Sequence, residues 1–190
     1  MNKLLIMAFA AATISACAAP LSNERNEKTV FITKASFPSD MGGLAGADAK
    51  CQTEADASAS TVPSGTYLAW LSDGTDSPDT RFTKSSHPYV LPDGTKVADD
   101  YTDLTDGSIQ NFINIGSKGK PVGQKLFWSS TKSDGTSEQD FLTCEGWTWT
   151  DTSTTIAHSM VGITTRKTTL WSMYAREKCG EPYRLVCFQQ

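Results

Sequence analysis

Four cysteines spread from residue 51 to residue 187 constrain the fold more than any other feature of the chain. They are Cys51, Cys144, Cys179 and Cys187. With Cys17 set aside, the chain has an even number of cysteines. In an exported protein this indicates two disulfides, and four cysteines leave three possible pairings. Zinc is the competing interpretation, but it is disfavoured because the cysteine spacings lack a C-x2-C pair and the two histidines, His87 and His158, stand alone.

The first seventeen residues indicate that the chain is exported. Lys3 supplies a positive charge near the start, and Leu4 to Ile14 is a nearly continuous apolar run of about eleven residues. A membrane-spanning helix needs roughly twenty apolar residues. The run is therefore too short to cross a bilayer and is typical of a signal peptide.

The end of that run resembles the lipobox of bacterial lipoproteins. Ile14-Ser15-Ala16-Cys17 places small residues before a cysteine. In such proteins the cysteine sulfur is acylated, for example with palmitate, and becomes the new N-terminus. The resemblance implies a signal peptide over residues 1–16, lipidation at Cys17 and a lipid-anchored protein of the cell envelope, in the outer membrane or at the cell surface. An ordinary secretory signal followed by a chance cysteine is the alternative.

Composition bounds the size and partners of the mature chain. Residues 18–28 are polar without apolar periodicity, which predicts a flexible tether over 17–28 and a single domain over 29–190. The chain has 17 basic and 21 acidic residues, and only Lys3 among them belongs to the signal peptide. A mildly acidic chain without a basic cluster is not expected to bind nucleic acid or anionic lipid. Contact with the membrane would come from the acyl chains on Cys17.

From residue 29 onward the pattern is that of a turn-rich, mainly β domain with one helix. The helix is indicated by apolar residues at three- and four-residue steps, namely Leu44, Ala47, Cys51 and Ala55. Strands are expected over 29–33, 67–71, 126–131 and 183–188, with a hairpin over 89–98. The Thr/Ser-rich stretch between Gly146 and Ser159 is expected to be a loop.

The order of the cysteines favours one pairing. The first lies on the predicted helix and the last on the final strand, whereas the middle two are close together near the C-terminus. This order suggests the disulfides Cys51–Cys187 and Cys144–Cys179, a long bridge that encloses a shorter one. A helical cysteine joined to a terminal-strand cysteine, with an inner pair before it, resembles the frame of C-type-lectin-like domains, endostatin included.

Local motifs resemble one bacterial group with this frame. They are Gly42–Gln52, Tyr67–Asp73, Ser77-Pro78, Thr80–Phe82, Pro88–Val90, Asp93-Gly94, Asp103–Gly107 and Arg184–Phe188. Over about residues 30–190 the chain resembles the endostatin-like exported lipoprotein domain of spirochaetes and other bacteria. The resemblance implies an α+β, C-type-lectin-like fold with short antiparallel strands, one or two helices, and long loops between about residues 101 and 169. It also implies display on a cell surface, where some members bind laminin or the complement regulator factor H.

Calcium-dependent sugar binding is disfavoured by the residues present. Such a site needs converging carboxylates and amides, because Ca²⁺ takes six to eight oxygen ligands. Glu181-Pro182-Tyr183 has no amide after the proline, and Trp147–Asp151 does not supply the other half of a lectin site. The densest carboxylate group comprises Asp99, Asp100, Asp103 and Asp106. A group of this kind is more often a solvated, turn-forming surface, so we expect no metal and no cofactor.

The candidates for ligand contact are aromatic and basic. Trp149 and Trp171 are candidates because tryptophan anchors protein contacts and stacks on sugars, although packing in the core is the alternative for each. Arg166 and Lys167 are candidates for contact with an anionic glycan or an acidic partner, with a solvated face as the alternative. The other three tryptophans are expected to lie in the core.

Together these observations favour a binding protein over an enzyme. No G-x-S-x-G nucleophile motif and no phosphate-binding loop occurs in the sequence. We expect an adhesin-like surface lipoprotein that binds a host or matrix protein, or an extracellular glycan, through loops on a rigid frame. An architectural envelope protein without an external ligand is the alternative, and an exported hydrolase is a less favoured third.

Overall fold

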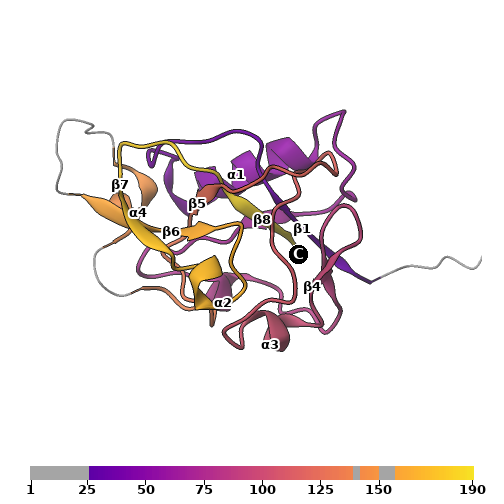
Figure 1. The fold of residues 1–190 in the computed structure, drawn as a ribbon. Coiled ribbons are helices and arrows are strands. Elements are labelled where there is room, and N and C mark those ends of the chain that lie inside the picture. The colour runs from indigo at the N-terminus through magenta and orange to yellow at the C-terminus, as the bar shows by residue number, and fades with distance from the viewer. Residues whose placement is uncertain (1–25, 139–141, 150–156) are drawn as a thin grey trace, which may run out of the picture.

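A computed structural model describes residues 26–138, 142–149 and 157–190 of the protein. Figure 1 shows the long helix α1 beside a sheet that contains β1 and β8, with a second, smaller sheet next to it. Residues 1–16 and Cys17 lie outside the described part of the chain, so the signal peptide and the acylation stay predictions.

The strands and helices are short, and among the described helices only α1 is longer than about one turn. In chain order they are β1 (Lys28–Ile32), α1 (Gly43–Ala55), β2 (Tyr67–Ala69), α2 (Pro78–Arg81), β3 (Tyr89–Val90), β4 (Lys96–Ala98), α3 (Tyr101–Leu104), β5 (Leu126–Trp128), α4 (Cys144–Trp147), β6 (His158–Ile163), the 3₁₀ turn η1 (Thr169–Trp171), β7 (Ala175–Lys178) and β8 (Val186–Gln189). Few helices and two sheets confirm the predicted α+β class. The first strand begins at Lys28, within the predicted tether.

The last strand of the chain lies inside the larger sheet. That sheet has the order β2-β8-β1-β3-β4, and the smaller sheet has the order β5-β6-β7. All neighbouring strands are antiparallel except β1 and β3, which are parallel. A bridge between Phe127 of β5 and Arg184, just ahead of β8, joins the two sheets. The first and last strands of the domain, β1 and β8, are therefore hydrogen-bonded neighbours in the larger sheet.

Both faces of the larger sheet are buried. Because side chains alternate along a strand, Val30 and Ile32 of β1 enter one apolar cluster while Phe31 enters another. On β8, Phe188 joins the first cluster and Cys187 the second. A strand that is buried on both sides has a continuous run of apolar residues in the sequence. This run made the predictions for β1 and β8 clear, and the structure confirms both strands.

Small residues let α1 lie close to the sheet. Its buried side is formed by Ala47, Cys51 and Ala55, as the sequence spacing predicted. The helix follows Gly42, whose φ of 81° is left-handed and suits glycine. At Gly46 a Cβ would lie 1.7 Å from the carbonyl oxygen of Met41, so the turn leaves room only for glycine.

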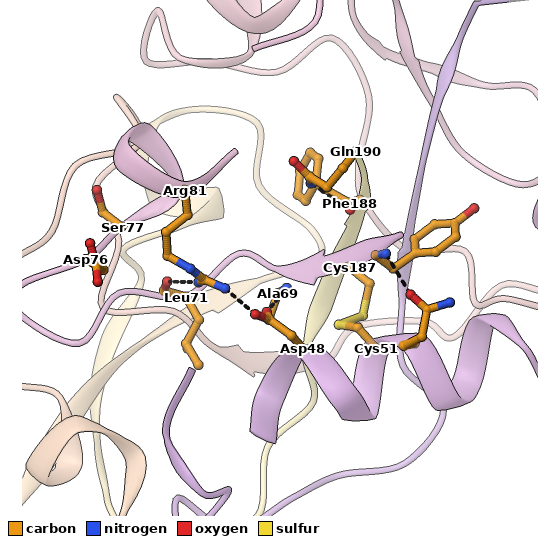
Figure 2. Close-up of polar contacts among 12 residues, drawn as sticks. Asp48, Cys51, Ala69, Leu71, Asp76, Ser77, Arg81, Cys187, Phe188 and Gln190 are labelled. Atoms are coloured by element: carbon orange, nitrogen blue, oxygen red, sulfur yellow. Dashed lines mark hydrogen bonds and ion pairs between the residues drawn. A yellow bond between two sulfur atoms is a disulfide. The ribbon is translucent and has the colours of Figure 1, made fainter. Parts of the chain in front are cut away.

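Two polar side chains of α1 cover the outer edge of β2, and Figure 2 shows the contact of Asp48 with Ala69. The Asp48 carboxylate accepts a hydrogen bond from the Ala69 N–H at 2.8 Å, and the Gln52 side-chain oxygen accepts one from the Tyr67 N–H at 3.0 Å. Four residues of helix and two residues of strand both advance about 6–7 Å, so the two spacings match. The helix thereby satisfies backbone donors that an edge strand would otherwise leave open.

A partly buried ion pair extends this contact to α2. The other oxygen of the Asp48 carboxylate pairs with the Arg81 guanidinium, and these side chains are only 18% and 14% exposed. Arg81 also donates to the Leu71 carbonyl at 3.3 Å (Figure 2). One aspartate therefore ties α1, β2 and α2 together.

Both disulfides have the predicted pairing. Cys51 of α1 is bonded to Cys187 of β8, and Cys144 of α4 to Cys179, which follows β7. The Cα atoms of each pair are 5.6 Å apart, which is typical of a disulfide. The segment labelled α4 is a left-handed turn, because φ is positive from Cys144 through Trp147. The long bridge thus pins the helix to the sheet, and the short one pins this turn to the smaller sheet.

The smaller sheet is where the sequence predictions were least complete. Strand β6 begins at His158, inside the stretch predicted as a loop, and β7 was not predicted. The sequence of β7, Ala-Arg-Glu-Lys, contains no β-branched or aromatic residue and is only half buried. Its pairing with β6 therefore comes from tertiary context and not from intrinsic strand preference.

We predict that the long disulfide stabilises the fold more than the short one. The bridges close loops with sequence separations of 136 and 35 residues. Loop entropy alone gives about 5 and about 4 kcal/mol, and because the loops are nested the two values do not simply add. Urea unfolding of the double alanine variants at residues 51/187 and 144/179 measures the difference. A larger loss from the inner pair would contradict this ranking.

The Asp48–Arg81 pair generates a second stability prediction. Arg81→Met leaves a partly buried carboxylate without its cation, and we expect a loss of roughly 2–4 kcal/mol in the free energy of unfolding. Lys96→Met is the matched control, because it breaks an ion pair that is much more exposed. The Lys96 side chain is 46% exposed and the Asp99 side chain is 59% exposed. That control should change stability by less than about 0.5 kcal/mol in thermal or urea unfolding. Equal losses from the two variants would show that Asp48 needs no cation.

Candidate binding surface

The two tryptophans predicted as candidate contacts lie in different environments. Trp171 is 1% exposed and packs in the apolar core with Trp70, their ring centroids 4.8 Å apart. The expectation of a surface contact at Trp171 is therefore wrong, because its ring completes the first core cluster. Its indole N–H has no hydrogen-bond partner within the described residues. Trp149 is half-buried and packs against the second cluster.

The two basic candidates are exposed and adjoin a second segment of the chain. Arg166 and Lys167 follow β6 and precede η1. The Lys167 carbonyl accepts the Ile109 N–H at 2.7 Å, and the Lys167 ammonium donates to the Gln110 carbonyl at 3.1 Å. These bonds hold the segment around residue 110 against the segment that carries both cations.

Large apolar side chains are exposed on the same two segments. Phe112 is 39% exposed and Leu170 is 40% exposed. We use the term η1 surface for Phe112, Arg166, Lys167 and Leu170. Sequence analysis missed both apolar members, because Leu170 directly precedes the buried Trp171 and a three-residue turn has no periodicity that assigns a side. Exposed apolar side chains next to cations are features of surfaces that bind other molecules.

The aspartates considered for calcium are occupied within the protein. Asp99 pairs with Lys96 at 2.5 Å, and this hydrogen bond lowers the pKa of the Asp99 carboxyl. Asp100 caps α3 by accepting the Asp103 N–H, and Asp103 accepts the Asp99 N–H at 2.7 Å. Within the described residues, no group of three or more His, Cys, Asp or Glu is arranged to hold a metal ion.

The interior also contains a set of buried hydroxyl groups. Ser172 accepts the Trp70 indole N–H at 2.7 Å and lies 3.0 Å from the Ser129 hydroxyl. The Ser72 hydroxyl lies 2.8 Å from that of Thr131. The partners are hydroxyls, carbonyls and an indole, so this set ties the two sheets together and has the chemistry of a structural network.

The two histidines lie in separate elements. His87 is exposed on the turn before β3, where its backbone N–H donates to the Ser85 hydroxyl at 3.0 Å. His158 begins β6, in the other sheet.

Comparison with protein-family models gave no match, and comparison with curated proteins gave no significant match either. The resemblance to the endostatin-like domain therefore stays a prediction from the motifs. Among the described residues, no helix has both the length and the apolar character needed to cross a bilayer.

Proposed function

We propose that this protein is a surface-exposed lipoprotein whose domain is a non-enzymatic, adhesin-like binding module for an extracellular protein or glycan. The η1 surface supports the proposal most directly, because Leu170 is exposed on the segment that carries Arg166 and Lys167, and Phe112 is exposed on the segment that is hydrogen-bonded to Lys167. Contact of this surface with a partner would bury the apolar side chains of Leu170 and Phe112, and Arg166 and Lys167 could pair with acidic groups of that partner.

The finer assignment to a C-type-lectin-like, endostatin-like fold belongs to the same proposal. It is supported by the ordered motifs and by a helix-to-last-strand disulfide, Cys51–Cys187, that encloses Cys144–Cys179. In such a frame the covalent links hold the ends of the domain, and the segments between strands are left to carry recognition.

Anchoring through lipid makes its own prediction. Cys17→Ser removes the acylated sulfur, and we expect the protein to move from the detergent-soluble membrane fraction to the aqueous fraction, because no acyl chain can then hold it to the bilayer. Immunoblotting after detergent phase separation measures this, with Ser22→Ala in the predicted tether as the control. Retention of the Cys17→Ser variant in the membrane in a form from which residues 1–16 have been cleaved would show that Cys17 does not carry the anchor.

The binding role is tested by a screen of the full chain against matrix proteins and a glycan array, with and without a chelator. For a ligand so found, the double variant Lys167→Glu/Leu170→Asn should bind about tenfold more weakly or worse, since it replaces one cation and one apolar contact on the η1 surface. Lys125→Glu, which reverses a charge at another exposed position, is the control. The melting temperatures of all three proteins should agree within a few degrees.

A screen without any ligand would favour the architectural envelope role instead. Binding that the double variant leaves unchanged would remove the η1 surface from the proposal. Binding that the chelator abolishes would contradict the expectation that no metal takes part.

A further inference from the structure

A basic groove lies on the protein at the end of β1. Its main hollow has a volume of about 370 Å³ and is lined by Lys34, Glu54, Lys118, Lys120, Pro121 and Arg184 among others. A second hollow of about 310 Å³ shares Lys34, Glu54 and Lys118 and continues past Ala35 and Ala57. We call the two together the Lys34 groove. Their size falls in the range of small-molecule sites.

The single carboxylate lining the main hollow is already satisfied by the protein. Both oxygens of Glu54 accept the backbone N–H of Lys34, at 2.8 and 2.9 Å, and one also accepts the Ser117 hydroxyl at 3.1 Å. Its charge therefore serves to fix the chain after β1 against α1. Four cations, Lys34, Lys118, Lys120 and Arg184, line the main hollow with this one carboxylate, so positive charge is in excess there.

Those cations have few internal partners. Lys34, Lys118 and Lys120 are exposed and form no ion pair within the described residues. Arg184 is half-buried in the wall, where one of its nitrogens donates to the Thr33 carbonyl at 2.8 Å. Burial lowers the pKa of its guanidinium, and the nearby Glu54 opposes that shift. The groove thus concentrates four cations in a chain whose formal net charge is −4.

Several backbone groups around the groove are paired within the protein. A tight turn is closed by Gly116 N–H to Lys120 carbonyl and Gly119 N–H to Gly116 carbonyl, each at 2.9 Å. The Ser117 carbonyl accepts the Thr61 N–H at 2.8 Å. The side chains of Pro121 and Val122 add apolar surface to the same wall.

We propose that the Lys34 groove binds an acidic oligosaccharide, a chain of pyranose rings that carry carboxylates. The apolar face of a sugar ring fits against Pro121 and Val122, and its carboxylate meets the Arg184 guanidinium and the ammonium groups of the turn. Two adjoining hollows with shared lysines accommodate consecutive acidic rings. Arginine is suited to planar carboxylates, and lysines at the rim attract the chain at longer range.

This inference goes beyond the η1 surface, because none of the four residues of that surface lines the Lys34 groove. This inference shares with the proposed function only the premise that the domain binds a ligand. The two sites can therefore fail independently, and variants of one serve as controls for the other.

The test is calorimetric titration of the full chain with a tetramer of galacturonate at low salt. We expect saturable binding that weakens as salt is added. The double variant Lys118→Gln/Lys120→Gln should bind at least about tenfold more weakly, because it removes two cations and leaves the backbone of the turn in place. Lys125→Gln, exposed and outside the groove, should bind like the unmodified protein, as should Lys167→Glu/Leu170→Asn of the η1 surface. A neutral tetramer of glucose should not bind.

Three results would overturn the proposal. The first is the absence of binding to the galacturonate tetramer, and the second is binding that the Lys118/Lys120 variant leaves unchanged. The third is equal affinity for a tetra-aspartate peptide, which would show that charge alone attracts ligands to the groove. A melting temperature of the double variant within a few degrees of the unmodified protein excludes unfolding as the cause of any loss.

Discussion

The bond between Cys51 and Cys187 is the constraint on which the rest of this domain depends. It joins the middle of the only long helix in the described structure to the last strand of the chain, and that strand lies between β1 and β2. Residues 136 positions apart are thereby held at the centre of the fold. A domain with mostly two- to five-residue strands has few hydrogen bonds per ladder, so a covalent link at this place limits how far its parts can separate.

The polar contacts of α1 complement that link. Asp48 and Gln52 lie one helical turn apart and serve two N–H groups of β2, while the apolar side of the helix faces the sheet. The sheet is consequently covered on both faces and at this edge. Both the η1 surface and the Lys34 groove are formed mainly by segments between the strands. A stiff frame that carries varied loops suits the binding role proposed above.

The parts of this arrangement that sequence analysis predicted are those with local signals. Apolar spacing placed α1, continuous apolar runs placed β1 and β8, and the order of the cysteines suggested the pairing. Strand β7 and the exposure of Leu170 had no such signal, because pairing with β6 and the packing of Trp171 decide them. The Lys34 groove was equally hidden, since its cations come from the end of β1, a loop at residues 118–120 and the residue pair before β8. Only the folded chain brings these positions together.

Because β1 and β8 are antiparallel, the start of β1 and the end of β8 lie at the same end of the larger sheet. Lys28 and Gln189 mark the same end of the two strands, where the Gln189 side chain accepts the Thr29 N–H at 3.0 Å. Lys34 lies beyond the opposite end, roughly 15–20 Å away along the strand. The N-terminal segment and the carboxyl end of the chain therefore enter and leave the larger sheet at the same end, and the basic hollow lies at the opposite end of β1.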